Sequence, residues 1–362
     1  MIRAFSIRRC GALLAAIVLF SAVATAEPAE EAPVFDPLER PAKQLKDATQ
    51  SAQLAIDNSG SRLVSVGEKG LILISDDSGR SWRQVNRVPV SVTLTDVHFI
   101  DEQIGFAVGH RGVLLTTSDG GENWKLKLDG EDIAKLYMTQ AKAMRESPGK
   151  DSALKEAGYL VQEGSDKPLL HVNFSDKRNG IIVGAYGLAL KTNDGGEAWV
   201  PFASEVANKE GRHLYGSSFG GERKYLIGEQ GSVFMREPNT HQFKQVSSPY
   251  NGSYFGAITT KAGDVLLYGL RGNLWSYLPK TGDWSQVDYP YGNSITSAFK
   301  VEGGEKIFLG DASGNLVELS LESSRKTSLL ENVGTYISDL IFVDGALVVS
   351  TVRGNLRIEA EL

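Results

Sequence analysis

The chain has 362 residues, with 44 acidic against 38 basic side chains and a formal charge of −6. An acidic balance of this kind argues against a nucleic-acid-binding protein. The only cysteine is Cys10. Beyond the first residues the chain therefore offers no disulfide, no thiolate metal site and no cysteine nucleophile.

The N-terminus has the pattern of an export signal over residues 1–26. A basic start precedes an apolar run at residues 11–24, and residues 24–26 (Ala-Thr-Ala) form a small-x-small cleavage site before Glu27. Cleavage would remove three arginines and leave 35 basic against 44 acidic side chains, a charge of −9. Because the run is short for a bilayer span, we expect a periplasmic protein with no integral membrane segment in the mature form. A retained N-terminal anchor is the alternative.

From residue 51 onward the chain repeats an apolar run, a Gly-x-x-Gly turn and a second apolar run. The second glycines of these turns are Gly70, Gly112, Gly187, Gly231, Gly272, Gly314 and Gly354. They lie about forty residues apart, except for one step of 75 between Gly112 and Gly187. A period near forty with room for four short strands is typical of propeller blades, and the glycines are expected to supply the positive φ of tight turns. The sequence therefore predicts an all-β, seven-bladed β-propeller over residues 51–362.

A second motif, the Asp-box Ser/Thr-x-Asp-x-Gly-x-x-Trp, follows the first three turns. Its aspartate, glycine and tryptophan are Asp77, Gly79 and Trp82; Asp119, Gly121 and Trp124; and Asp194, Gly196 and Trp199. We expect the aspartate to accept backbone N–H bonds, the glycine to be left-handed and the tryptophan to pack between sheets. The motif then staples a hairpin; contact with calcium or sugar is the alternative.

The long step between the second and third blades contains about 33 extra residues. Residues 132–146 have the periodicity of an amphipathic helix, and residues 151–161 that of a shorter one. We expect a helical hairpin within residues 127–168, on the same face as the Gly-x-x-Gly turns. It either covers a blade edge or contacts a partner, through Tyr137, Met138 and Met144.

The last blade has room for only three strands before the chain stops at Leu362. An unpaired sheet edge invites aggregation, and a ring needs closure. Residues 27–50 contain a leader rich in Pro and Glu, followed by a stretch at 36–50. This stretch is predicted to supply the closing fourth strand.

The chain resembles the Asp-box (BNR) repeat family, and in particular the propeller proteins related to the photosystem II assembly and stability factor. The resemblance covers about residue 57 to the C-terminus and rests on Gly-x-x-Gly followed by an Asp-box, as in Gly109 to Trp124. It implies a non-catalytic assembly or scaffolding factor that binds other proteins close to a membrane complex. Relatives in other bacteria accompany exporters of the resistance-nodulation-division class, which makes such an exporter a possible partner. The helical insert departs from the family pattern, so a photosynthetic partner is not carried over.

Asp-boxes also occur in sialidases, so a glycan-binding protein or a glycoside hydrolase is the alternative function. A sialidase needs an arginine cluster, a Tyr/Glu nucleophile pair and an acidic proton donor. The nearest string to its Arg-Ile-Pro signature is at residues 87–89, which follow an Asp-box, and no Tyr-Glu pair can be placed by spacing. We therefore predict no catalytic residues, no metal and no cofactor.

One side chain per blade precedes the second glycine. These residues are Lys69, Arg111, Tyr186, Gln230, Arg271, Ser313 and Arg353. Equivalent blades would place them on one face, around the central channel, and four of the seven are cationic. They are either ordinary solvated turn residues or a basic ring that binds an acidic partner.

Overall fold

The computed structural model describes residues 36–301, 306–321 and 327–360. The expected signal peptide, residues 1–26, and the first part of the leader lie outside the described residues. Residues 36–362 form one compact unit.

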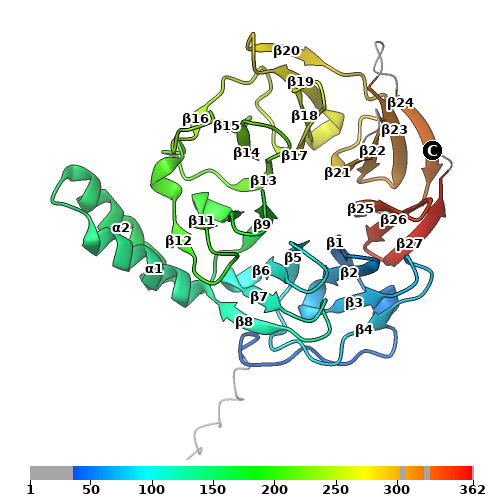
Figure 1. Ribbon diagram of the computed structural model, residues 1–362, viewed down its shortest axis with the longest axis horizontal. Helices are drawn as coiled ribbons and strands as arrows, with labels where there is room; N and C mark the ends of the chain where they lie inside the picture. Colours follow the sequence, from blue (N-terminus) through cyan, green and yellow to red (C-terminus); the bar gives the residue numbers. More distant parts are fainter. Residues whose placement is uncertain (1–35, 302–305, 322–326, 361–362) are drawn as a thin grey trace, which may run out of the picture. The chain divides into compact units, whose positions relative to one another are not determined.

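Seven antiparallel sheets follow one another along this unit (Figure 1). The strands of the first three blades are β1 (Gln53–Ser59), β2 (Arg62–Gly67), β3 (Ile72–Ser75) and β4 (Arg83–Gln84); β5 (Leu94–Phe99), β6 (Gly105–Gly109), β7 (Leu114–Thr117) and β8 (Lys125–Leu128); and β9 (Leu169–Phe174), β10 (Gly180–Gly184), β11 (Ala189–Thr192) and β12 (Val200–Pro201). Those of the next three are β13 (Leu214–Ser218), β14 (Lys224–Gly228), β15 (Val233–Arg236) and β16 (Lys244–Gln245); β17 (Tyr254–Thr259), β18 (Val265–Gly269), β19 (Leu274–Leu278) and β20 (Asp283–Gln286); and β21 (Ile295–Lys300), β22 (Lys306–Asp311), β23 (Asn315–Ser320) and β24 (Thr327–Asn332). The seventh blade has β25 (Ile337–Val343), β26 (Ala346–Thr351) and β27 (Gly354–Glu359).

The first strands of the seven blades contact one another in a closed circle, β25 meeting β1, and they surround the centre of the ring in Figure 1. Two helices, α1 (Gly130–Ala143) and α2 (Pro148–Glu163), lie between β8 and β9. The prediction of a seven-bladed propeller with a helical hairpin between blades two and three is confirmed.

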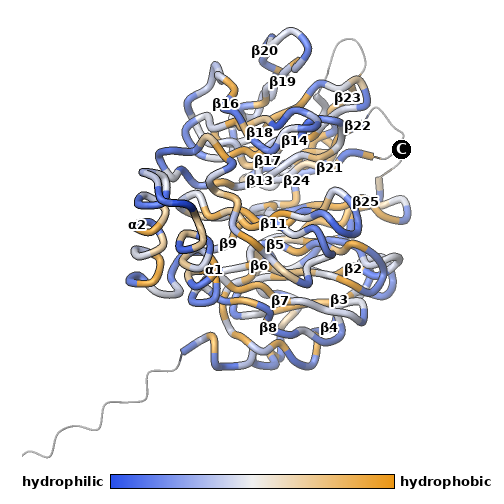
Figure 2. The backbone as a smooth tube through the Cα atoms, turned by 60° about the vertical axis from the view of Figure 1, so that its left-hand side comes forward, coloured by the Kyte–Doolittle hydropathy of each residue, from blue (hydrophilic) through white to orange (hydrophobic). Residues whose placement is uncertain are grey.

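The middle strands of each blade are apolar on both faces because each sheet packs against two neighbouring sheets. Leu63 and Val64, which are adjacent in β2, are both fully buried. Val64 packs in one cluster with Trp124 of the second blade, while Leu63 packs with Val348 of the seventh. Figure 2 shows apolar residues along the middle strands and hydrophilic residues in many of the connections.

In several blades an aspartate of the first strand forms a hydrogen bond with the backbone of a neighbouring blade. Asp57 accepts the N–H of Phe99 in the following blade, with oxygen and nitrogen 2.7 Å apart. The seventh blade is joined to the first in the same way, because Asp339 accepts the N–H of Ile56 at 3.0 Å. These hydrogen bonds from a side chain of one blade to the backbone of the next help to close the ring without a shared sheet.

The predicted closing strand is wrong. Residues 36–50 contain turns and the short 3-10 helix η1 (Ala48–Gln50), and the seventh sheet has three strands. Pro37 and Pro41 lack the N–H groups that a strand ladder needs. The segment instead bonds to blade one and the connection after it, as in Ala42 N–H to the carbonyl of Val88 at 3.0 Å.

Residues 47–52 nevertheless take the place of a connection between blades. In the first blade, a Cβ added to Gly70 would lie 2.3 Å from the carbonyl oxygen of Val90, in the connection to blade two. In the seventh blade, a Cβ on Gly354 would lie 2.0 Å from the carbonyl oxygen of Thr49. Residues 47–52 therefore pass over the last blade as the connection after blade one passes over the first.

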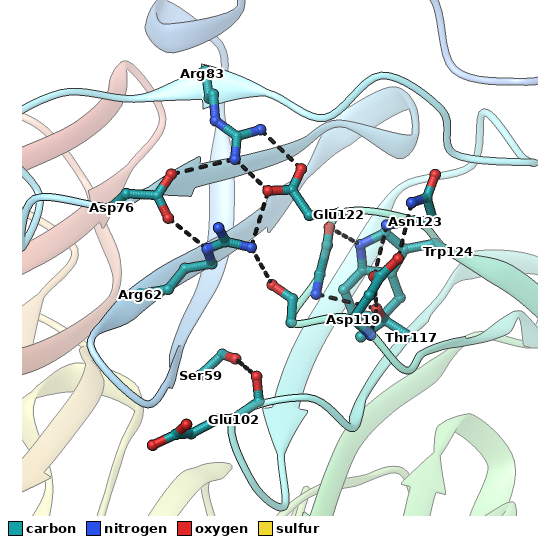
Figure 3. A network of polar contacts seen from close by, with 12 residues as sticks. Ser59, Arg62, Asp76, Arg83, Glu102, Thr117, Asp119, Glu122, Asn123 and Trp124 are labelled. Atoms are coloured by element: carbon teal, nitrogen blue, oxygen red, sulfur yellow. Dashed lines mark hydrogen bonds and ion pairs between the residues drawn. The ribbon is translucent and has the colours of Figure 1, made fainter.

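Blades one and two are also linked at their outer edge by two arginines and two carboxylates (Figure 3). Arg62 contacts Asp76 at 2.6 Å and Glu122 of the second blade at 3.1 Å, and Arg83 contacts the same two carboxylates. Hydrogen bonding from Arg83 lowers the pKa of Glu122. Four alternating charges form a network, which stabilises more than an isolated exposed pair does.

Candidate functional site

The Gly-x-x-Gly turns join the second strand of each blade to the third, so they all lie at one end of the sheets, here called the turn face. The first glycine of the second blade, Gly109, is extended rather than left-handed. A Cβ there would lie 2.3 Å from the carbonyl oxygen of Thr93, and His110 donates its N–H to that oxygen at 2.9 Å. The first glycine is therefore needed because the backbone of the preceding connection approaches it closely, and only the second glycine is needed for its positive φ.

The residue before the second glycine is itself left-handed in five blades. Its φ is 58° at Lys69, 63° at Arg111, 56° at Tyr186, 54° at Gln230 and 58° at Arg271. This conformation costs an L-residue about 1–2 kcal/mol. Because the five backbones match, the Cα–Cβ bonds leave their turns in the same direction. Ser313 and Arg353 do not share it, since in their turns only the second glycine has positive φ.

The cationic side chains on the turn face are not equivalent. Lys69, Arg271 and Arg353 are exposed, and within the described residues none of them forms an ion pair. Arg111 is half-buried and contacts the carboxylate of Asp36 at 3.4 Å. The turns follow the second strand of each blade, and those of blades one, two, three and five contact the first strand of the next blade.

The Asp-boxes staple hairpins at the opposite end of the sheets, between the third and fourth strands. In the first box, Asp77 accepts the hydroxyl of Ser75 and the N–H of Ser81, both at 2.8 Å. Hydrogen bonds from Ser81 and Ser75 lower the pKa of Asp77 to about 2. Trp124 and Trp199 of the later boxes are buried between neighbouring sheets. No group of three or more His, Cys, Asp or Glu side chains in the described part of the chain could hold a metal ion.

The family model for the photosynthesis system II assembly factor YCF48 matches residues 80–142 and 153–249. Among solved structures, "YCF48 bound to D1 peptide" is 14% identical, with 91% of this chain and 99% of that chain covered and a TM-score of 0.63. YCF48 from Cyanidioschyzon merolae is 15% identical, with 86% and 96% covered and a TM-score of 0.59. A computationally designed protein, Ika8, is 14% identical, with 86% and 97% covered and a TM-score of 0.58. No curated protein sequence matches the chain.

The chain is a BNR-type propeller related to YCF48. The two stretches matched by the family model run from the first Asp-box to the end of the fourth blade, and they are interrupted at the turn between α1 and α2. The matched stretches of this BNR-type propeller include nearly all of α1 and most of α2, and leave out residues 143–152 around the turn between them.

An aromatic row that sequence reasoning missed crosses the turn face of this BNR-type propeller. Tyr186 is 62% exposed, and the centroid of its ring lies 4.8 Å from that of His213. The row continues to Tyr215 in β13 and Phe255 in β17, at centroid distances of 6.3 and 5.9 Å. The ammonium of Lys167 lies 4.9 Å from the Tyr186 ring. Exposed aromatic side chains beside cations are typical of energetically important residues at protein interfaces.

The helical hairpin starts and ends on the turn face. A Cβ on Gly130 would lie 3.0 Å from the carbonyl oxygen of Arg111 and 2.6 Å from the Cα of Ser165, so the two ends of the insert meet. The first helix begins earlier than expected because Asp129 caps it, and the second begins at Pro148, after Ser147 as its cap.

The hairpin residues proposed for partner contact differ in their surroundings. Tyr137 is not available, because its hydroxyl donates to the carbonyl of Ala189 at 3.2 Å and accepts the N–H of the same residue at 3.0 Å. Met138 and Met144 are half-buried. The exposed apolar side chains of the hairpin are instead Tyr159 and Val161 of α2, which are 50% and 55% exposed.

An open hollow of about 750 Å³ at the opposite end of the blades is lined by three carboxylates. Its lining includes Asp57, His98, Asp101, Glu102 and Lys177. Asp57 accepts the N–H groups of Phe99 and Asn58, and burial raises its pKa. Asp101 accepts those of Gln103 and Ile104, which lower its pKa. Both carboxylates hold neighbouring backbone in place.

Proposed function

We propose that this propeller is an exported, non-catalytic assembly or accessory factor that binds a protein partner through its turn face. The observation that carries the proposal is the set of five equivalent turns with a left-handed residue before the second glycine. Strain accepted at equivalent positions outside the core suggests a functional constraint. Three exposed cations without an ion pair in the described residues, and the aromatic row beside them, suit a partner with acidic and apolar side chains.

The likeness to YCF48 supports a peptide or protein as the partner, since one of the similar structures is described as bound to a D1 peptide. The N-terminal pattern at residues 1–26 supports export to the periplasm. No helix in the described ranges is long and apolar enough to cross a membrane. We propose a membrane complex as the partner, with a resistance-nodulation-division-type exporter as the first to test.

The experiment is affinity capture of the tagged mature protein from its own cell envelope. The turn-face variant carries Arg111→Ala, Arg271→Ala and Arg353→Ala. A matched control carries Arg80→Ala, Lys177→Ala and Lys280→Ala, which are exposed cations at the opposite end of the blades. We expect the intact protein and the control to retain the same membrane complex, and the turn-face variant to lose most of it. Equal recovery with all three proteins would contradict the proposal.

A hairpin deletion completes the design. Because the ends of the insert meet, Gly130 can be joined directly to Ser165 without residues 131–164. We expect this variant to fold and to retain the partner. Loss of the partner from it, with full recovery by the turn-face variant, would move the site to the hairpin.

A further inference from the structure

A small hollow lies on the turn face where the N-terminal segment crosses blade one. Its volume is about 230 Å³. The lining residues are Arg40, Lys43, Leu45, Lys69, Leu71 and Ser91, and they define what is called the cation-rimmed hollow below. Leu45 supplies exposed apolar surface, the buried Leu71 lies beneath it, and none of the six residues is acidic.

The hollow is formed before any partner binds, because hydrogen bonds fix the segment on blade one. Leu45 donates its N–H to the side chain of Gln84 at 2.9 Å, and Gln84 donates back to the carbonyl of Lys43 at 2.8 Å. On the other side, Ser91 donates its N–H to the carbonyl of Pro37 at 2.9 Å. A preformed hollow avoids the entropy cost of ordering a loop on binding.

The exposed surface of the hollow combines apolar and cationic groups. Leu71 is buried, whereas Leu45 is 39% exposed. Lys43 and Lys69 are exposed, and neither forms an ion pair within the ranges that the structure describes. The hollow thus offers apolar contact at its wall and positive charge at its rim.

We propose that the cation-rimmed hollow binds one large apolar side chain from an acidic segment of the protein partner. Its volume lies below the roughly 300–1,000 Å³ of pockets for drug-sized ligands, so it suits a single side chain. Lysines act as flexible point charges that can meet carboxylates on either side of that side chain. This inference rests on the proposed function, because Lys69 belongs to the turn face, and it adds the chemistry of the partner.

The test is a fluorescence anisotropy titration of the mature protein with a short amidated peptide, in which acidic residues flank one leucine. A second peptide has serine in place of the leucine. The protein variant carries Lys43→Gln and Lys69→Gln, and glutamine suits the second position because Gln230 has the same left-handed conformation in blade four. The matched control is Lys46→Gln, an exposed lysine of the same segment outside the hollow.

We expect saturable binding of the leucine peptide, and about tenfold weaker binding both of the serine peptide and by the double variant at low salt. The control variant should stay within about twofold of the unmodified protein. Equal affinities for the two peptides, equal affinities of the double variant and the control, or no saturable binding would each overturn the inference. Binding of an anionic detergent with higher affinity than the leucine peptide would also overturn it, in favour of a lipid-like ligand.

The two experiments distinguish a wrong inference about the hollow from a wrong proposal for the turn face. If the peptide results overturn the inference while the variant at Arg111, Arg271 and Arg353 still loses the membrane complex, the proposed function stands without this hollow.

Discussion

At the scale of single residues, the turn face is built at a cost in stability. Arg271 has a φ of 58° and is exposed, with no ion pair in the described residues to compensate for the strain. A left-handed L-residue costs about 1–2 kcal/mol, whereas glycine adopts this region freely but loses more entropy on folding. A side chain that forms no ion pair in the described residues and is held in a costly conformation is expected to serve binding.

Arg271→Gly should therefore raise the free energy of unfolding by about 0.5–1 kcal/mol, as measured by denaturant unfolding. Arg271→Ala keeps the left-handed strain and should give no such gain. Both variants should bind the partner less well than the unmodified protein. A glycine variant less stable than the alanine variant would show that the strain argument is wrong.

At the scale of elements, the helical hairpin is bonded to blade three by the hydroxyl of Tyr137 and by the side-chain amide of Gln140, which donates to the carbonyl of Pro201 at 2.7 Å. Tyr137 bonds both backbone groups of Ala189 at the start of β11. Tyr137→Phe removes the hydroxyl and leaves the N–H of Ala189 without this acceptor, while the carbonyl of Ala189 still accepts the N–H of Phe202 at 2.9 Å. We expect the free energy of unfolding to fall by about 1–3 kcal/mol, and hydrogen exchange in α1 to accelerate. An unchanged exchange rate in α1 would contradict this role.

At the scale of the whole molecule, the ring closes where blade seven meets blade one, without a shared sheet. Asp339 lies at this junction and accepts hydrogen bonds from Ile56 and Ser297. Burial raises the pKa of Asp339 to about 7, from 3.8 in the unfolded chain. Between about pH 4 and pH 7 Asp339 is thus more protonated in the folded protein than in the unfolded chain, and the contribution of this group to stability is lost as the pH rises.

Asp339→Asn should remove this dependence. The difference in free energy of unfolding between the unmodified protein and the variant should decrease with rising pH by up to about 1.4 kcal/mol per unit in that window. Ser338→Ala is the control, because Ser338 bonds the carbonyl of Gln53 at the same junction but does not titrate. It should lower stability by about 1 kcal/mol at every pH. A pH-independent difference for Asp339→Asn would contradict the assignment.

The repeated blades and the helical hairpin could be predicted from the sequence because their signals are local, whereas contacts between distant segments could not. The glycine period identifies seven blades because each turn needs glycine for a local reason, close approach at Gly109 and positive φ at Gly112. The prediction of a closing strand was wrong, because residues 36–50 form a strand only if they pair with the seventh sheet, and the sequence does not show which blade they contact. The sequence contains two prolines there, but it does not show that the segment bonds to the carbonyls of Val85 and Val88 in place of pairing with the seventh sheet.

The aromatic row and the cation-rimmed hollow could not be predicted either, because each joins residues that lie far apart in the sequence. Tyr186 comes from a turn of blade three, while Tyr215 and Phe255 belong to the first strands of blades four and five. Their contact depends on the curvature of the ring, which no local pattern specifies. Comparing the second position of each first strand would have shown Tyr215 and Phe255 where other blades have Thr95 and Ser338.

The most direct test of a partner-binding turn face is hydrogen–deuterium exchange of the propeller with and without the captured partner. We predict that the partner protects the turns at residues 67–70, 184–187 and 269–272, and leaves the Asp-box turns at 75–82 and 192–199 unchanged. Protection confined to the Asp-box turns would place the partner on the opposite face and contradict the central claim.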